Sequence, residues 1–442
     1  MARFTFAGGI HPYDGKDLSK DKPIKEVDPG KTLYFPLSQH IGAPATPIVE
    51  KGQRVLVGEK IAEAGGFVSA PIHSSVSGTV KGIEDHRNAT GDMVPCIVIE
   101  NDEQYEEGLP LHQKLFEDMT REEVIGYVKE AGIIGMGGAG FPTHVKLSPK
   151  DPSAIDCVIV NCAECEPYLT SDYRKMLEEP EKLVRGLAIE LSLFPGANGY
   201  LAIEDNKPDC IRVLREKARK FDNIFVRPLK TKFPQGSERQ LIYAVTGRSI
   251  NSKKLPADAG CIVNNVDTVI AIHNAVDVGK PLYERIVTVT GDAIANPQNF
   301  KVRTGTLYST LVEAAGGFKS EPEKIISGGP MMGFAMFDIE VPVAKSSSAL
   351  LCMTKDEVAA NSPSPCINCG RCTEVCPSRL VPAKLADVAE RFDEESFLAN
   401  YGLECVECGS CSYVCPAKKQ LAQAIKTMRK TALANARKRA QK

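Results

Sequence analysis

The sequence predicts a multidomain chain that combines α/β and α+β architecture, with a β-rich start and a helical, cysteine-rich end. Three observations predict this. Short β-type runs broken by glycine fill residues 31–100, and helical and strand-like runs alternate over residues 121–270. Eight cysteines in two matching runs then close the chain. A length of 442 residues leaves room for roughly three or four domains of about 100–200 residues each.

The bulk composition is that of an ordinary globular protein, with 43% hydrophobic and 25% charged residues. The net charge of −2 argues against a general nucleic-acid binder, which would carry a basic surface. No apolar run reaches the roughly 18 residues that a membrane span needs, and residues 1–10 lack the apolar core of an export signal. We therefore expect the chain in the cytoplasm or on the cytoplasmic face of a membrane assembly.

Residues 1–112 are expected to form the first domain. Alternating apolar residues and glycine-led turns over residues 49–61 and 70–80 predict a small β-sandwich or barrel. The pattern resembles the biotinyl/lipoyl-type hammerhead domains. Those carriers display a lysine on a hairpin tip, and residues 62–69 at the equivalent place contain none. A docking or scaffolding role is therefore favoured over a swinging arm.

The second domain is expected over residues 113–279. Helical spacing covers residues 121–131, 180–193 and 209–221, and strand-like runs cover residues 154–161 and 199–204. This alternation predicts a Rossmann-like α/β domain with a largely parallel sheet.

A small mixed α+β module, which resembles β-grasp (SLBB-like) modules, is expected over residues 280–345. It is predicted from the β-run at residues 285–291, a short helix at 309–315 and the turn-rich loop at 328–333. Residues 350–442 are expected to form a helical domain that contains the cysteine runs.

Those runs are Cys366-x-x-Cys369-x-x-Cys372-x-x-x-Cys376-Pro377 and Cys405-x-x-Cys408-x-x-Cys411-x-x-x-Cys415-Pro416. This spacing holds two [4Fe–4S] clusters, and the fourth cysteine of each run ligates the other cluster. The predicted ligand sets are Cys366, Cys369, Cys372 and Cys415 for one cluster, and Cys405, Cys408, Cys411 and Cys376 for the other. Structural zinc would need Cys-x-x-Cys pairs separated by longer loops, and disulfides are disfavoured in a reducing compartment.

A glycine-rich loop occupies residues 135–140, with the sequence Gly-Met-Gly-Gly-Ala-Gly. It matches G-x-G-x-x-G, but it follows a predicted helix and continues into Phe141-Pro142-Thr143, so a dinucleotide fingerprint is not predicted. Such a loop can still wrap backbone N–H groups around a phosphate or a flavin edge. A tight turn without a ligand is the alternative.

Three polar segments accompany this loop, at residues 161–167, 233–239 and 263–268. The first follows a predicted strand, and α/β sheets bind ligands beyond the carboxyl ends of their strands. Amide and carboxylate side chains suit the isoalloxazine ring and ribityl chain of a flavin and the ribose of a nicotinamide nucleotide.

Residues 120–275 resemble the flavin-bearing, NADH-oxidising subunit of respiratory complex I, with its G-R-G-G-A-G-F-P-T, N-A-D-E-S-E-P, G-E-E and N-N-V-E-T patterns. This chain has Met136, Leu147 and Ser237 where those patterns carry arginine, tryptophan and glutamate. With its first, third and fourth domains added, the whole chain resembles the C-subunit family of Rnf complexes. Members of that family pass electrons between NAD(H) and ferredoxin in an ion-pumping membrane assembly.

The resemblance implies which residues bind the cofactors. The flavin residues would be Gly135, Gly137, Gly138, Lys146, Asn161, Glu164, Asn264 and Asn265, with Lys146 beside the phosphate. The nucleotide residues would be Phe141, Glu166, Gly236 and Glu238. No side chain is expected to act as a general acid or base, because the chemistry belongs to the cofactors.

The resemblance further implies FMN and two [4Fe–4S] clusters as cofactors and NAD(H) as the substrate. Hydride exchange between NAD(H) and FMN would be followed by a one-electron relay through the clusters. The expected partners are membrane-embedded and iron–sulfur or flavin subunits of the same complex, with ferredoxin contacted indirectly and no nucleic acid. The chain would be peripheral on the cytoplasmic face of the bacterial inner membrane. A soluble NADH dehydrogenase or bifurcating diaphorase subunit, an iron–sulfur relay without flavin, and a zinc-binding structural protein are the alternatives.

Cys162 and Cys165 form a Cys-x-x-Cys inside the flavin motif, and buried small side chains are favoured there over a redox dithiol or a metal site. His73 and His144 are expected as isolated loop residues. The basic tail consists of Lys426, Arg429, Lys430, Arg437, Lys438, Arg439 and Lys442. A solvated helix end is favoured for it, and contact with a partner or anionic lipid is the alternative.

Overall fold

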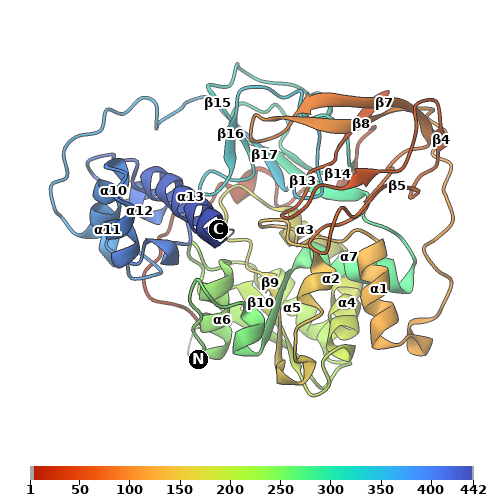
Figure 1. The fold of residues 1–442 in the computed structure, drawn as a ribbon, viewed down its shortest axis with the longest axis horizontal. Coiled ribbons are helices and arrows are strands. Elements are labelled where there is room, and N and C mark those ends of the chain that lie inside the picture. Colours follow the sequence, from red (N-terminus) through yellow and green to blue (C-terminus); the bar gives the residue numbers. More distant parts are fainter. Residues whose placement is uncertain (1–3, 441–442) are drawn as a thin grey trace.

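Four modules follow one another along the chain and pack side by side in the computed structural model (Figure 1). The structure describes residues 4–440. Residues 1–3, part of the segment in which no export signal is expected, and Lys442 of the basic tail lie outside it. Within the described part of the chain, no helix is both long enough and apolar enough to cross a membrane.

The first module consists of two antiparallel sheets, with strand orders β2-β8-β7-β4 and β3-β5-β6. The strands are β2 (Thr32–Pro36), β3 (Thr46–Pro47), β4 (Arg54–Val55), β5 (Lys60–Glu63), β6 (Ile72–His73), β7 (Gly78–Arg87) and β8 (Met93–Asn101). Alternate side chains such as Leu33, Phe35 and Ile97 point inward and form one core between the sheets. The prediction of a loop at His73 is wrong: this residue ends β6 and is buried, because Ile72 and His73 pair with β5.

The second module is a parallel four-stranded sheet with the order β11-β10-β9-β12. Its strands are β9 (Cys157–Cys162), β10 (Asn198–Glu204), β11 (Ile224–Leu229) and β12 (Cys261–Asn265), and its helices are α1 (Arg121–Glu130), α2 (Thr143–Lys146), α3 (Ser171–Glu178), α4 (Pro180–Ser192), α5 (Pro208–Ala218), α6 (Glu238–Thr246) and α7 (Val266–Asp277). The prediction of a loop at His144 is also wrong, since residues 143–146 close one helical turn after Pro142 and form α2.

Helices cover both faces of this sheet, which explains why the strand runs are apolar without alternation. Val158 and Val160 pack with α4, α5 and α7 on one face, whereas Ile159 packs with α6 on the other. Asn161 and Asn265 are register partners at the carboxyl ends of β9 and β12. The sheet therefore presents its polar residues at a single edge.

The third module is a six-stranded mixed sheet with the order β1-β14-β13-β17-β15-β16. It contains β1 (Lys25–Glu26), β13 (Glu284–Thr290), β14 (Gln298–Arg303), β15 (Lys324–Ser327), β16 (Phe334–Met336) and β17 (Ala349–Met353), with α8 (Tyr308–Ala314) against it. Strands β1 and β17 come from outside the predicted range 280–345. Its core, around Val287, Phe300 and Leu350, is separate from that of the second module.

The fourth module is helical and contains α9 (Arg371–Glu374), α10 (Pro382–Glu390), α11 (Glu394–Ala399), α12 (Ser410–Tyr413) and α13 (Leu421–Ala440). Helices α9 and α12 occupy the same place in the two cysteine runs, and each follows a glycine with positive φ, 78° at Gly370 and 75° at Gly409. The module is therefore an internal repeat, with α10 and α13 packed together beneath it.

The N-terminal strap, which we define as residues 4–19, precedes the first sheet and runs from the second module past the fourth. Figure 1 shows this red segment rising from the N-terminus between α6 and the blue helices. Gly9 N–H donates to the carbonyl of Val375 in the fourth module at 2.9 Å. Ile10 forms a bridge with Phe233 of the second module.

Candidate functional site

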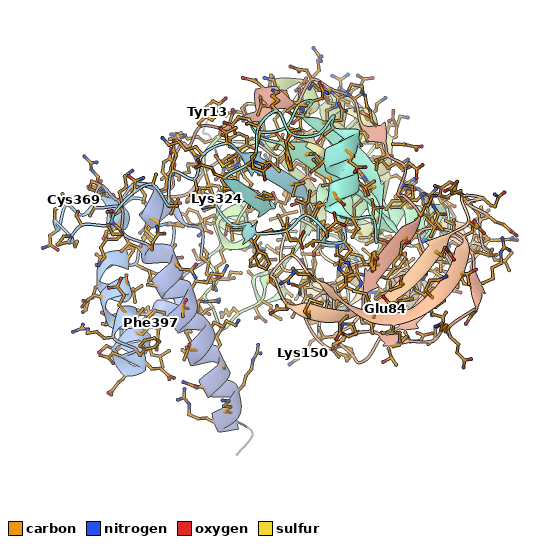
Figure 2. The ribbon with its side chains drawn as sticks, turned by 90° about the horizontal axis from the view of Figure 1, so that it is seen from above. Tyr13, Glu84, Lys150, Lys324, Cys369 and Phe397 are labelled. Atoms are coloured by element: carbon orange, nitrogen blue, oxygen red, sulfur yellow. The ribbon has the colours of Figure 1, made fainter. Side chains whose placement is uncertain are left out.

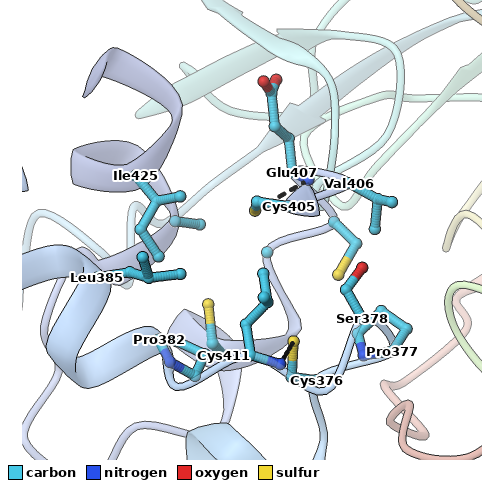
Figure 3. A pocket seen from close by; sticks show the side chains of 14 residues that line it. Cys376, Pro377, Ser378, Pro382, Leu385, Cys405, Val406, Glu407, Cys411 and Ile425 are labelled. Atoms are coloured by element: carbon cyan, nitrogen blue, oxygen red, sulfur yellow. Dashed lines mark hydrogen bonds between the residues drawn. The ribbon is translucent and has the colours of Figure 1, made fainter. Parts of the chain in front are cut away.

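Eight thiols of the fourth module line two separate pockets. Cys376, Cys405, Cys408 and Cys411 line one pocket, which Figure 3 shows from close by. Cys366, Cys369, Cys372 and Cys415 line the other. Each pocket is thus surrounded by three cysteines of one run and the fourth cysteine of the other. We name the first group the inner thiol set and the second the outer thiol set.

The two sets differ in exposure. Cys408 of the inner set is 7% exposed and packs against Phe233 of the second module and Ile10 of the strap. Cys366 and Cys369 of the outer set are exposed, and Cys369 lies at the far edge of the fourth module in Figure 2. The inner set therefore faces the rest of the molecule, and the outer set faces its surroundings.

The arrangement of donors fits [4Fe–4S] clusters. Backbone N–H groups of Leu380, Glu407 and Asn368 each point to a ligand sulfur at 3.4 Å, as N–H groups do around cluster sulfurs. Burial raises the pKa of Cys405 to about 11 and that of Cys411 to about 12. Both thiols are therefore protonated without iron, and cluster binding releases their protons.

The glycine loop lies at the carboxyl edge of the parallel sheet. Gly137 has a φ of +73°, and a Cβ there would lie 3.1 Å from the side-chain nitrogen of Asn265. A Cβ on Gly135 would lie 3.5 Å from the ammonium of Lys146, whereas a Cβ on Gly138 would meet open space. The loop therefore packs against the side chains of Asn265 and Lys146, and its backbone is exposed at Gly138.

Asn161 connects the first polar segment to the second. Its amide nitrogen donates to the carbonyl of Gly236 at 2.8 Å, and its oxygen accepts from Ala163 N–H at 3.2 Å. The Cys165 sulfur accepts from Gly236 N–H at 3.2 Å. Cys162 is fully buried, and burial raises the pKa of its thiol. Cys162, the last residue of β9, and Cys165, in the loop that follows, are thus both packed against neighbouring groups of the site.

A buried chain of polar groups runs beneath the glycine loop. Asn265 donates to Asp172 at 2.6 Å, and the backbone N–H of Asp172 donates to Glu164 at 2.7 Å. Lys16 of the strap lies 3.6 Å from the other Glu164 oxygen. Burial and the nearby carboxylates of Glu164 and Asp267 raise the pKa of Asp172 to about 7. This chain holds Asn265 and Glu164 in fixed orientations.

Asn264 and Lys146 belong to a second buried group. Asn264 donates to Glu190 at 3.1 Å, and Lys146 donates to the carbonyl of Val263 at 3.0 Å. Burial raises the pKa of Glu190 to about 7. Among residues 4–440, the amide oxygen of Asn264 and Oε2 of Glu190 lack a hydrogen-bond partner in the structure. Unpaired polar atoms beside an exposed glycine loop fit a polar ligand such as FMN.

The residues assigned to the nucleotide are more dispersed. Glu166 turns toward the third module, where its carboxylate accepts from the N–H groups of Met331 and Met332 at 2.7 and 2.9 Å. Phe141 is half-buried, and Glu238 is exposed at the start of α6. The flavin residues are therefore clustered, whereas Glu166 and Glu238 lie in different surroundings.

Sequence reasoning missed several buried charges that support the site. Lys207 donates to the carbonyl of Ala163 at 2.7 Å and pairs with Glu204 at 3.3 Å. Glu204 ends β10 at the same edge of the sheet as Asn161. The rule that α/β sheets bind ligands beyond the carboxyl ends of their strands could therefore have identified this pair as well. Lys16 and Glu190 gave no local signal, because both come from elements remote from the predicted polar segments.

Four protein-family models match the chain, and their order along it is that of the four modules. Residues 4–104 match the RnfC barrel sandwich hybrid domain, and residues 128–274 match the Nuo51 FMN-binding domain. Residues 286–335 match the SLBB domain, and residues 365–419 match a 4Fe-4S dicluster domain. The predicted multidomain architecture is confirmed by these matches.

The chain is 44% identical to the C subunit of the Na(+)-translocating ferredoxin:NAD(+) oxidoreductase complex of Acetobacterium woodii, over 98% of each chain. The chain belongs to the C-subunit family of Rnf complexes. Two more relatives agree. The proton-translocating counterpart from Clostridium ljungdahlii is 44% identical over 88% of this chain and 85% of its own. The C subunit of the ion-translocating oxidoreductase complex of Rhodobacter capsulatus is 39% identical over 87% and 75%.

The predicted family and cofactors are confirmed by the family models and relatives. The chain is an electron-transfer subunit of an oxidoreductase complex, with FMN and two [4Fe–4S] clusters as its cofactors. The fold is also shared with an NAD+-reducing [NiFe]-hydrogenase in the H2-reduced state. That likeness has a TM-score of 0.50 at 17% identity and covers 72% of this chain and 62% of the hydrogenase chain.

Proposed function

We propose that this chain is the site at which its complex exchanges electrons with NAD(H), and that the inner thiol set holds the first cluster after the flavin. The observation that carries the proposal is one buried apolar cluster, which contains Cys408 and against which Cys165 and Met331 pack. Cys165 lies in the flavin-site loop, and Met331 holds the Glu166 carboxylate. This apolar cluster therefore joins the proposed nucleotide site to the inner thiols.

The chain's own residues would position the cofactors. Gly137 and Gly138 would present backbone N–H groups to FMN, and Lys146 would neutralise its phosphate. Gly135 would shape the cradle from below, because its own N–H donates to the carbonyl of Phe141 at 2.7 Å. Asn161, Glu164, Asn264 and Asn265 would hydrogen-bond the ring and ribityl chain. When bound, FMN supplies the exchange between the two-electron chemistry of NAD(H) and the one-electron chemistry of the clusters.

Phe141 would pack against the nucleotide, while Gly236, Glu166 and Glu238 would orient its ribose or carboxamide. No proton-transfer residue is required, so these side chains act through binding and orientation. The buried carboxyl of Asp172 would hold the Asn265 side chain in place, and that of Glu190 would hold the Asn264 side chain.

The outer thiol set would pass electrons to a partner redox subunit, because its exposed cysteines bring that cluster to the molecular surface. The partners would be the membrane-embedded and iron–sulfur or flavin subunits of the same complex, with ferredoxin further along the path. We place the chain on the cytoplasmic face of the bacterial inner membrane, where NAD(H) and reduced thiols are available.

An anaerobic NADH titration of the reconstituted chain, followed by absorbance and EPR spectroscopy, tests this proposal. About one FMN and eight iron atoms per chain are expected, with flavin bleaching on addition of NADH and [4Fe–4S] signals appearing on reduction. Cys408→Ala should remove one cluster and block reduction of the other by NADH, whereas Cys369→Ala should leave the first step intact. Full iron content without any response to NADH would contradict the proposal.

A further inference from the structure

The N-terminal strap is anchored at both ends on the carboxyl edge of the parallel sheet. Phe4 forms a parallel bridge with Leu229, the last residue of β11. Further along the strap, the ammonium of Lys16 donates to the carbonyl of Glu166 at 3.1 Å and pairs with Glu164. The strap therefore runs along this edge from the end of β11 to the segment after β9.

Its middle joins two modules through backbone hydrogen bonds. Ile10 N–H donates to the carbonyl of Phe233 at 2.8 Å, and Phe233 N–H donates to the carbonyl of Ile10 at 2.9 Å. On the other side, Gly9 N–H donates to Val375 at 2.9 Å. Val375 immediately precedes Cys376, the cysteine that crosses over to the inner set. The strap thus links the ligand segment of the inner set to the second module.

Two glycines make this approach possible. Gly8 has a φ of +82°, and a Cβ there would lie 2.9 Å from the carbonyl oxygen of Val375 and 3.0 Å from that of Cys376. Gly9 has a φ of +85°, and its Cβ would lie 2.9 Å from the carbonyl oxygen of Phe233. Both the backbone conformation and the contact exclude a side chain.

The strap also covers the innermost thiol. Ile10 is 4% exposed and Phe233 1%, and together with Cys408 they form a buried apolar cluster. Solvent exposure of cluster ligands is one of the factors that set a cluster's reduction potential. Water stabilises the more negative, reduced state, so the apolar cover holds the potential of the enclosed cluster low.

We propose that Gly8, Gly9 and Ile10 are positioning residues for the inner cluster. They fix the Cys376 segment against the second module and exclude water from Cys408, and so they set both the placement and the potential of that cluster. The inference rests on the proposed assignment of the inner thiol set to one of the two clusters.

The test uses the full chain with FMN and both clusters reconstituted, in an EPR-monitored redox titration. The strap variants are Ile10→Ala and Gly9→Ala. The matched control is Gly317→Ala, since Gly317 has a φ of +81° and open space around its Cβ position, so it carries the same backbone strain without a contact. Cys408→Ala and Cys369→Ala identify which spectral signal belongs to the inner and which to the outer cluster.

The expected result is a positive shift of the inner-cluster potential in both strap variants, with the outer-cluster potential unchanged. Gly317→Ala should leave both potentials unchanged. Faster deuterium uptake at residues 8–10 in the Gly9→Ala chain would report the loosened strap directly.

Three results would overturn the proposal. Strap variants whose inner-cluster potential matches the Gly317→Ala control would show that the strap does not set it. Equal shifts of both clusters would show a general loosening of the fourth module. A Cys408→Ala chain that keeps all of its iron would instead refute the ligand assignment, and the strap inference with it.

Discussion

The backbone N–H of Met331, in the third module, donates to the side-chain carboxylate of Glu166, in the second, at 2.7 Å. This contact fixes a carboxylate of the proposed nucleotide site from another module. Burial raises the pKa of Glu166 while the N–H groups of Met332 and Met331 oppose that shift. The third module is therefore part of the proposed nucleotide site, although the proposed flavin residues all come from the second.

Gly329→Ala should displace Glu166, because a Cβ at Gly329 would lie 2.1 Å from its Cγ. We expect the KM for NADH to rise roughly tenfold, equivalent to about 1.4 kcal/mol, with FMN content unchanged. Steady-state kinetics with an artificial electron acceptor measures this. Gly126→Ala, in α1 with open space around its Cβ position, is the control and should leave KM unchanged. An unaltered KM in Gly329→Ala would remove Glu166 from the nucleotide site.

Gly137→Ala should weaken FMN binding, because its Cβ would push against the Asn265 side chain while the backbone keeps a φ of +73°. Gly247→Ala has a similar φ of +76° and no neighbour within 4 Å, so it reports backbone strain alone. Both variants should lose about 1 kcal/mol of stability. Only Gly137→Ala should bind FMN at least tenfold more weakly in a fluorimetric titration. Equal FMN affinity in the two variants would contradict the assigned role of the loop.

Lys345→Met should destabilise the chain in a pH-dependent way. The Lys345 ammonium donates to Pro71 in the first module and Gly132 in the second, at 2.6 and 2.8 Å, and burial lowers its pKa to about 7. Between pH 7 and about 10 the unfolded chain holds a proton on Lys345 that the folded chain lacks, so wild-type stability rises with pH in that window.

The Met variant lacks this dependence and leaves two buried carbonyls unpaired. It should be less stable by about 1–3 kcal/mol at pH 9, and by less at pH 6. Anaerobic urea unfolding at several pH values measures the difference. Lys81→Met, at an exposed lysine, should show no such trend. A constant difference across the pH range would mean that Lys345 remains charged in the folded chain.

The Arg239–Glu404 pair should help dock the fourth module on the second. Glu404 accepts from Arg239 at 2.9 Å and from Ser252 N–H and Oγ at 2.8 and 2.6 Å. A double-mutant cycle of Arg239→Ala and Glu404→Gln should give a coupling energy of about 0.5–1 kcal/mol in urea unfolding at pH 7. The value should fall in high salt, and additive single effects would show that the pair contributes no docking energy.

Much of the molecule could be predicted from local pattern. The cysteine spacing predicts both thiol sets, and the apolar runs predict the strands whose carboxyl ends bring Asn161 beside Asn265. The supporting contacts could not be predicted in this way. Lys16, Arg285 and Lys345 are each separated by many residues from the groups that they bind. Arg285, for example, reaches from β13 to a buried ion pair with Asp267 in α7, and no periodicity or motif marks such a pairing.

The hydrogen bond from Gly9 to Val375 spans most of the chain, and the pairing of β1 with β14 spans more than half of it. During synthesis, the first residues must wait until the ribosome has made nearly everything else before they find their partners. The amino terminus therefore takes its final place on the fourth module only late in synthesis.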